Sequence, residues 1–335
     1  MNCRKVSVIV PNYNHAPYLR QRLDSIFNQT FQDFEVIILD DCSTDNSKEI
    51  IEEYRNRLQV SHVVYNETNS GSPFKQWAKG FNLAQGEYIW IAESDDWAEL
   101  NLLDEMVRYL DRDSSLAFAF CESYWEHPNQ TILGTYLAKD TFFKGTRFLK
   151  NRQIYFNNIY NASSVLFRKQ SLASIPKDYQ NFLGSGDYLF WSCLCEKGNV
   201  YYTSKRLNHF RRHSAATTCK SFSTGINFIE NHRIYEYFKQ KRLVSTLANF
   251  RIVDSELSQI EQNRPDLIQI GNYTKCRQLW EKELKLSSAS SIFLLFLARK
   301  INKYSGLPFI VKVWKFLHLP NTDLREKIRK KFGNQ

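Results

Sequence analysis

Long apolar runs, a secretory signal peptide and a regular cysteine pattern are all missing from this chain of 335 residues. No run approaches the roughly 20 apolar residues that a transmembrane helix requires, and the N-terminus leads directly into a predicted strand. The seven cysteines are odd in number and irregularly spaced, so they predict no disulfide framework. We therefore expect a cytoplasmic protein in which Cys193 and Cys195 are buried thiols.

Two common nucleotide-binding motifs are also missing. No Gly-x-Gly-x-x-Gly follows the first predicted strand, and the chain contains no Gly-x-x-x-x-Gly-Lys. A bound nucleotide would therefore need another geometry. The net charge of +10 is uneven, since residues 296–335 hold ten Lys or Arg against two Asp or Glu, a net of +8. This distribution argues against a nucleic-acid-binding core and for a basic C-terminal patch.

Strand and helix patterns alternate through the first two thirds of the chain. Strands are predicted at residues 6–10, 34–41, 60–65, 88–92 and 116–121. Alternation at this spacing predicts an α/β fold with a mostly parallel central sheet flanked by helices. The pattern at 131–179 is weak and stays unassigned, and after about residue 225 it becomes helical. We therefore predict one domain at 1–224 and a helical, basic region at 225–335.

Acidic residues gather where two of these strands end. Asp40 and Asp41 end the second strand, and Glu93, Asp95 and Asp96 follow the fourth. In open α/β sheets, ligands bind at the carboxyl ends of the strands. Acids there can hold a cation, share a proton or cap the next helix. The strand-end pattern alone leaves these alternatives open.

Two later segments add polar candidates. Asp187 follows a pair of glycines and precedes apolar residues at helical spacing, so it either caps a helix or belongs to a site. Residues 210–218 are first basic and then rich in hydroxyl groups. Such a loop could clasp an anion or simply be solvated.

The C-terminal region interleaves aromatic and aliphatic residues with Lys and Arg, most clearly at 292–300 and 308–319. This is the composition of an interfacial helix that lies on anionic lipid. The same residues could instead pack on the rest of the chain or form a homo-oligomer. An anionic membrane surface, at the inner face of the cell membrane, is therefore one candidate partner among these.

Taken together, the motifs resemble those of family 2 glycosyltransferases of the GT-A fold. The resembling pieces lie at residues 6–14, 40–47, 80–88, 93–96, 186–187 and 211–213. Each piece is short, but six in this order make a specific match over about two thirds of the chain. The resemblance implies a Rossmann-like fold with a nucleotide-sugar-binding half at 1–121 and an acceptor-binding half at 122–224.

The resemblance also implies how the donor, a UDP-sugar, would be bound. The residues placed at the nucleoside are Pro11 and Tyr13 at the base and Asp41 at the uracil ring. One departure lies in the third predicted helix, where many members have Ala-Arg-Asn with a donor-binding arginine. This chain has Gln76, Trp77 and Ala78 there, so Lys75 or Lys79 would have to supply the positive charge.

Residues 94–96 resemble the Asp-x-Asp-type element of the family, which binds Mn²⁺ or Mg²⁺. Asp96 would be the direct metal ligand, and Ser94 and Asp95 would lie at the donor, with Asp95 able to contribute to the metal site. Such ions take oxygen ligands and neutralise the charge of a departing diphosphate. Arg211 and His213 match a loop that closes over the diphosphate.

Asp187 matches the catalytic base, which removes the proton of the attacking acceptor hydroxyl and inverts the anomeric centre. We therefore predict an enzyme of cell-surface polysaccharide or glycolipid synthesis, acting on a glycan or lipid-linked acceptor. A glycoside hydrolase would leave the acids at 40–41 unexplained, and a sugar-1-phosphate nucleotidyltransferase would carry a Gly-rich, Arg-containing loop at 11–14. The remaining alternative is a non-catalytic or partner-activated binding protein that kept the fold.

Overall fold

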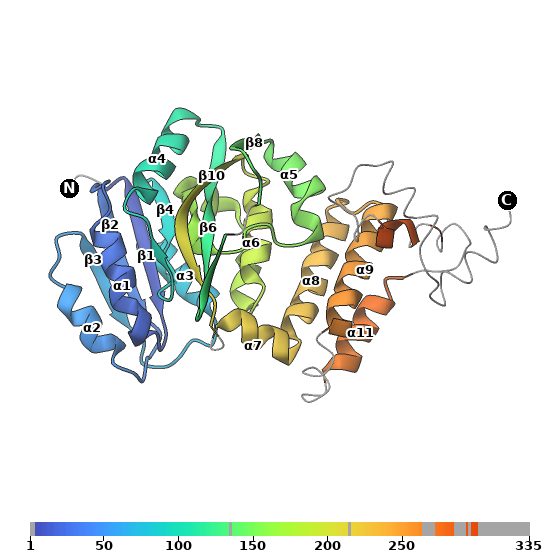
Figure 1. Ribbon diagram of the computed structural model, residues 1–335, viewed down its shortest axis with the longest axis horizontal. Helices are drawn as coiled ribbons and strands as arrows, with labels where there is room; N and C mark the ends of the chain where they lie inside the picture. Colours follow the sequence, from blue (N-terminus) through green and yellow to red (C-terminus); the bar gives the residue numbers. More distant parts are fainter. Residues whose placement is uncertain are drawn as a thin grey trace. The chain divides into compact units, whose positions relative to one another are not determined.

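The computed structural model describes residues 4–133, 136–213, 216–262 and 272–284, together with 293 and 296–300. The chain divides into two compact units (Figure 1). The first contains the residues up to 153 and 157–220, and the second contains 154–156 and the residues from 221 onward. Among the described helices, none is long and apolar enough to span a membrane.

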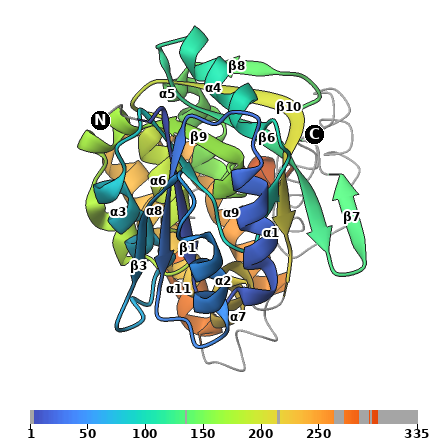
Figure 2. The same cartoon turned by 90° about the vertical axis from the view of Figure 1, so that its left-hand side faces the viewer.

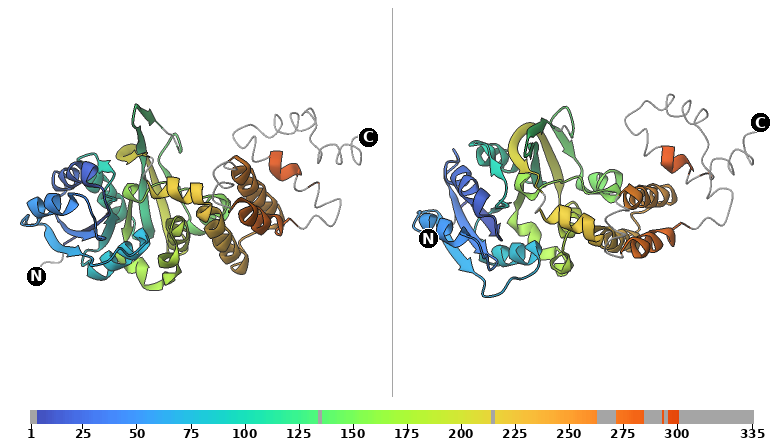
Figure 3. Two further views of the ribbon diagram at one scale, coloured as in Figure 1. Left: turned by 90° about the horizontal axis from the view of Figure 1, so that it is seen from below. Right: turned by 60° about the horizontal axis from the view of Figure 1, so that its bottom comes forward.

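The first unit is built on one mixed sheet. Its strands are β1 (Val6–Asn12), β2 (Phe34–Asp40), β3 (Val60–Tyr65), β4 (Tyr88–Ile91), β5 (Trp97–Ala98), β6 (Leu116–His127), β7 (Gln130–Leu133), β8 (Thr141–Phe143), β9 (Val165–Arg168) and β10 (Asn199–Arg211). The order in space is β3-β2-β1-β4-β9-β6-β10-β5, with β7 beside β6 and β8 beside β10. Figure 3 shows the end of β6 and β7 as an arm that projects from the sheet, and every residue of β7 is exposed.

The parallel pairs of the sheet are β1 with β2, β1 with β4, β2 with β3 and β6 with β10. Strand β9 runs antiparallel between β4 and β6 and so joins the two parallel parts. This confirms the predicted α/β class. The sequence pattern did not reveal β9, because it is only four residues long and lies in the unassigned segment.

Helices cover both faces of the sheet. The helices up to residue 224 are α1 (Ala16–Phe27), α2 (Ser47–Tyr54), α3 (Pro73–Leu83), α4 (Leu102–Arg112), α5 (Gly145–Asn151), α6 (Gly186–Leu194) and α7 (Thr217–Thr224). The described residues also form four 3₁₀ helices, η1 (Gln153–Tyr155), η2 (Ala162–Ser164), η3 (Lys169–Ser174) and η4 (Lys177–Asn181). Figure 2 shows α1 and α3 on opposite sides of β1.

Strand β1 explains why both layers form. Val8 and Val10 are fully buried in a cluster that includes Leu23 of α1 and residues of α2 and α4. Ile9 points the other way, toward α3, where a Cβ on Gly80 would lie 2.5 Å from the Ile9 Cγ2 atom. A strand buried on both faces is mostly apolar rather than alternating. This is why the sequence pattern identified β1.

Aromatic rings pack helix α3 against helix α6. The ring of Trp77 lies 5.8 Å from that of Phe190 and 5.9 Å from that of Trp191. Helix α6 begins at Gly186, where a Cβ would lie 2.5 Å from the Phe74 ring. Such a short contact would push the two helices apart. Glycine therefore allows the first turn of α6 to lie close to α3.

The second unit contains α8 (Ile226–Gln240), α9 (Thr246–Gln262) and α11 (Tyr273–Glu281). Its core residues are Phe228, Tyr235, Ile252, Val253, Ile260, Cys276 and Trp280. The predicted helical character of the C-terminal region is confirmed for the residues of it that the structure describes. The segment at 308–319 and most of the basic stretch at 296–335 lie outside the described residues, so the membrane and oligomer hypotheses stay predictions.

Glu256 of α9 is buried in this unit and makes its stability depend on pH. Its Oε1 accepts a hydrogen bond from Asn231 Nδ2 at 3.1 Å, whereas Oε2 has no partner among the described residues. Burial raises the pKa of Glu256 from 4.5 to about 8. The folded unit therefore keeps a proton that the unfolded chain releases, so its stability falls as the pH rises from about 4.5 to 8.

We expect Glu256→Gln to remove this pH dependence and to raise the free energy of unfolding at pH 8 by roughly 2–4 kcal/mol. Denaturant unfolding at pH 5, 6.5 and 8 measures the slope of the free energy of unfolding against pH. Hydrogen exchange of peptides from α8 and α9 shows whether the change in stability lies in this unit. An equal slope in the wild-type protein and the variant would show that Glu256 is not the titrating group.

Candidate active site

Three strand ends meet at one edge of the sheet. The register pairs Asn12 with Asp40, and Ile9 with Ile91, so the loops after β1, β2 and β4 lie side by side. The Asn12 Nδ2 atom donates a hydrogen bond to Asp40 Oδ1 at 2.8 Å. The loops after β1 and β4 are joined by His15 Nδ1 and Ser94 Oγ, which are 2.8 Å apart. The polar residues that follow these strands therefore lie close together.

The residues that the resemblance places at the nucleoside, at the ends of the first two strands, lie together at this edge. Pro11 is buried opposite Leu39, and Tyr13 is 44% exposed. Asp41 is buried, and its Oδ1 accepts hydrogen bonds from Asn66 Nδ2 at 2.6 Å and from Gln76 Nε2 at 2.8 Å.

Ser70 completes the hydrogen bonding of the Asp41 carboxylate. Its backbone N–H donates to Oδ1 at 2.9 Å and its hydroxyl donates to Oδ2 at 2.8 Å. Four donors thus fix the orientation of the carboxylate before any ligand binds. No sequence motif pointed to this set of donors, because they come from the loop before α3 and from its first turn.

Helix α3 departs from the family pattern in a way that the structure explains. Trp77 is buried, and its Nε1 donates a hydrogen bond to Glu93 Oε1 at 2.8 Å. Lys75 instead turns to the loop before α3, where its Nζ donates to the Ser70 carbonyl at 2.9 Å. Lys79 donates to Asn66 Oδ1. Both lysines therefore lie on the side of Asp41 rather than at the acidic turn.

The acidic turn, residues 93–96, separates its two aspartates. Asp96 is fully buried, and its Oδ2 accepts hydrogen bonds from Asn161 Nδ2 and Ser163 Oγ, both at 2.7 Å. Its Oδ1 accepts a bond from the backbone N–H of Arg211 at 3.0 Å. Burial and the charge of Asp95 raise the pKa of Asp96 to about 6. Three protein donors thus bind the Asp96 carboxylate, and its assignment as the direct metal ligand stays a prediction.

A buried arginine, which no sequence motif singled out, lies under the acidic turn. Arg22 of α1 is fully buried, its Nε donates to the Glu93 carbonyl at 3.0 Å, and its guanidinium lies 4.9 Å from the Trp90 ring centroid. Burial lowers the pKa of Arg22 to about 10. Burial and the charge of Asp95 raise the pKa of Glu93 to about 8. The feature of the sequence that could have pointed to Arg22 is its position as an arginine on the apolar face of α1.

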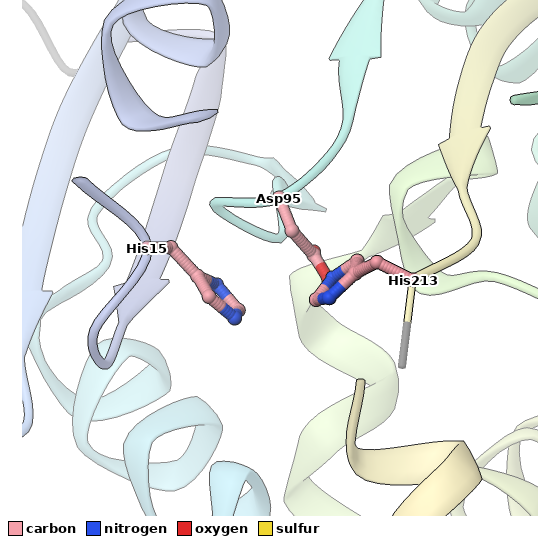
Figure 4. A group of neighbouring side chains, drawn as sticks. All are labelled: His15, Asp95 and His213. Carbon is pink, nitrogen blue, oxygen red and sulfur yellow. The ribbon is translucent and has the colours of Figure 1, made fainter. Parts of the chain in front are cut away.

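Asp95 lies between two histidines, His15 and His213 (Figure 4). His213 Nε2 is 3.0 Å from Asp95 Oδ2, and one ligand atom from each of the three residues lies within 4.8 Å of the others. Burial acts to raise the pKa of Asp95, but the hydrogen bond from His213 and the charges of both histidines hold that pKa below its usual value. One carboxylate and two imidazoles can ligate a first-row transition metal.

Arg211 and His213 both reach the acidic turn, and their predicted role at the diphosphate stays a prediction. Arg211 Nη1 donates to the Asp95 carbonyl at 2.7 Å, and Nη2 donates to Gln21 Oε1 at 2.7 Å. Its guanidinium also lies 4.5 Å from the centroid of the Tyr18 ring. These contacts tie the end of β10 to α1 and to the turn after β4.

Asp187 lies in the first turn of α6, and the N-cap position belongs to Ser185. It is therefore not the cap that its position in the sequence also allowed. Its Oδ2 accepts a hydrogen bond from Asn157 Nδ2 at 2.8 Å. Helix α6 packs against α3, whose Trp77 binds Glu93, so one chain of contacts runs from the acidic turn to the helix that carries Asp187.

A mixed sheet with acids and histidines at the carboxyl edge of its parallel strands, and a further carboxylate at the start of α6, fits a protein of the GT-A class. The chain belongs to the family described as glycosyl transferase family 2, whose model matches residues 7–174.

Two curated relatives illustrate this membership. Over 181 residues the chain is 33% identical to the poly(ribitol-phosphate) beta-N-acetylglucosaminyltransferase TarS of Staphylococcus aureus, a match that covers 49% of this chain but only 31% of TarS. Over 197 residues it is 29% identical to the putative teichuronic acid biosynthesis glycosyltransferase TuaG of Bacillus subtilis, covering 59% of this chain and 74% of TuaG.

Solved structures agree on the fold. The crystal structure of S. aureus TarS 1-349 in complex with UDP-GlcNAc aligns over 98% of this chain and 92% of the TarS chain, with a TM-score of 0.60 and 19% identity. The mannosyltransferase PcManGT from Pyrobaculum calidifontis, in complex with GDP-Man and Mn²⁺, matches 91% and 88% with a TM-score of 0.51 and 14% identity. The predicted GT-A fold is thereby confirmed.

Proposed function

We propose that this chain is an inverting glycosyltransferase that moves a sugar from a UDP-sugar to a hydroxyl of a surface polysaccharide or a lipid-linked glycan. The observation that carries the proposal is the joint presence of Asp95 between two histidines and of Asp187 on α6. Asp95 and the two histidines suit the binding of a metal ion and a diphosphate, and Asp187 suits the role of a general base. A hydrolase needs only the carboxylates, and a binding protein needs no base.

The donor side is supported by the edge formed by β1 and β2. The exposed ring of Tyr13 offers a face for a base, and the backbone of Pro11 lies beside it. The Asp41 carboxylate, held by four donors, would accept the N–H of uracil without rearranging. The related TarS structure is a complex with UDP-GlcNAc, so an N-acetylhexosamine is the first donor sugar to test.

For the metal, we propose three protein ligands: Asp95, His213 and His15. Asp96 would instead hold the turn through Asn161 and Ser163. A set that contains imidazole favours Mn²⁺ over Mg²⁺, which prefers oxygen ligands. When bound, such an ion neutralises the charge that the diphosphate acquires as the sugar departs.

On the acceptor side, Asp187 would accept the proton of the attacking hydroxyl. A base in hydrogen-bond reach contributes about 10²–10⁴-fold to the rate. Attack from the side of α6, with the nucleotide leaving on the side of the strand ends, displaces the donor in one step and inverts the anomeric carbon. Arg211, fixed against α1 and Asp95, would stabilise the leaving diphosphate.

Calorimetric titration of UDP, GDP, CMP and dTDP, each with Mn²⁺ and with EDTA, tests the donor and metal together. We expect UDP to bind most tightly and its affinity to fall by at least about tenfold when the metal is removed. Turnover of UDP-GlcNAc on a polyol-phosphate or glycan acceptor then tests transfer. Binding of none of the four nucleotides would favour the alternative of a non-catalytic or partner-activated protein.

A further inference from the structure

We propose that Asn157 is a positioning residue that orients the carboxylate of Asp187, and that Gln153 holds Asn157 in the orientation required. The inference rests on the proposed function, since it assigns a role next to the proposed base. Asn157 lies between η1 and η2 in the segment that the sequence pattern left unassigned. No motif pointed to it.

Two backbone N–H groups determine how the amides are oriented. The N–H of Asn158 donates to Gln153 Oε1 at 3.0 Å, and the N–H of Ile159 donates to Asn157 Oδ1 at 3.2 Å. A backbone N–H can only donate, so both amide oxygens must face these groups. The Gln153 Nε2 atom is then the one that points to Asn157 Oδ1, at 3.0 Å.

With its oxygen accepting two hydrogen bonds, Asn157 presents its Nδ2 to Asp187. That atom donates to Asp187 Oδ2 at 2.8 Å. The reverse orientation would place an amide oxygen against the carboxylate and leave two donors unpaired. Gln153 is fully buried, and its backbone carbonyl accepts a hydrogen bond from Tyr188 Oη at 2.7 Å. The network is therefore anchored both to the loop and to the residue after Asp187.

Such a network has two consequences for a general base. A hydrogen bond to Oδ2 fixes the plane of the carboxylate, so that it meets an incoming hydroxyl in one geometry. The same bond favours the charged form, which is the form that accepts a proton. Asn157 would therefore act on the rate of transfer and on its dependence on pH, not on donor binding.

The first test compares Asn157→Ala with the wild-type enzyme. We expect kcat to fall by about 10–100-fold, the KM for UDP-sugar to stay within about twofold, and the acidic limb of the kcat profile to move to higher pH. Asn157→Asp places a carboxylate beside Asp187 and should move that limb further in the same direction. Asn56→Ala, at an exposed asparagine after α2, is the control and should match the wild-type protein.

Gln153→Glu tests the relay without touching Asp187. The carboxylate cannot donate to Asn157 Oδ1, so the Asn157 amide loses one of the two bonds that orient it. We expect kcat to fall and the pH profile to shift in the same directions as in Asn157→Ala, but by smaller amounts. The double variant with Asn157→Ala should be no worse than Asn157→Ala alone, because both changes break one interaction.

The outcomes separate this inference from the proposed function. A wild-type protein that transfers no sugar refutes the proposed function. A wild-type protein that transfers sugar, with Asn157→Ala unchanged in kcat and pH profile, refutes the positioning role alone. A variant that loses UDP binding and kcat together would show a structural role instead, and an additive double variant would exclude the relay through Gln153.

Discussion

Asp187→Asn is expected to lower kcat by about 10²–10⁴-fold, the contribution of a positioned general base. Asparagine has nearly the same shape, and its Oδ1 can still accept the hydrogen bond from Asn157. The variant therefore loses a proton acceptor and little else. Affinity for UDP with Mn²⁺ should stay within about twofold, because Asp187 lies on α6 and the nucleoside residues lie at the ends of β1 and β2. Initial rates and calorimetry on one preparation measure both quantities.

Asp178→Asn is the matched control, since Asp178 is an exposed acid on the nearby η4. It should leave both kcat and UDP affinity unchanged. If Asp187→Asn kept the full rate while Asp178→Asn did the same, another group would be the base. If Asp187→Asn lost UDP binding as well as rate, the effect would be structural, and the carboxylate would belong to the donor side.

The parts of the fold that could be predicted from sequence are those in which local pattern and burial agree. Strands β1, β2 and β4 are buried along their whole length, so each appears as a mostly apolar run followed by polar residues, interrupted only by Ser7 in β1 and Glu35 in β2. The carboxyl ends of parallel neighbours must meet at one edge. The gathering of Tyr13, Asp41 and Asp95 therefore follows from three local patterns and one topological rule.

The parts that could not be predicted depend on contacts between distant segments. Adjacent residues of a turn point in different directions, and no local pattern shows which of Asp95 and Asp96 turns inward. Asp96 does so because Asn161 and Ser163 supply donors from beyond β6. Asn157 was missed for the same reason, since its role depends on the partner that the fold brings to it.

The second large effect is expected from Asp95→Asn, which should abolish the metal dependence of UDP binding. Asparagine keeps the volume of the side chain and can still contact His213, but it offers no charge to a cation. Removing a residue that hydrogen-bonds to a metal ligand commonly lowers metal affinity by about 10–100-fold. Removing a direct ligand should lower it by at least as much. Titration of UDP at several Mn²⁺ concentrations measures this loss. His213→Ala and His15→Ala should each weaken Mn²⁺ in the same direction.

Asp96→Asn distinguishes this assignment from one in which Asp96 is the ligand. Its side chain is fully buried and accepts bonds from Asn161, Ser163 and the Arg211 backbone, so an amide would turn a donor against at least one of these donors. The cost of such a mismatch is about 1–3 kcal/mol of folding free energy. We therefore expect a lower unfolding temperature and, in the protein that stays folded, a metal dependence close to that of the wild type. A well-folded Asp96→Asn protein that binds UDP equally with and without Mn²⁺, beside an Asp95→Asn protein that still responds to the metal, would make Asp96 the ligand and Asp95 a partner of the histidines.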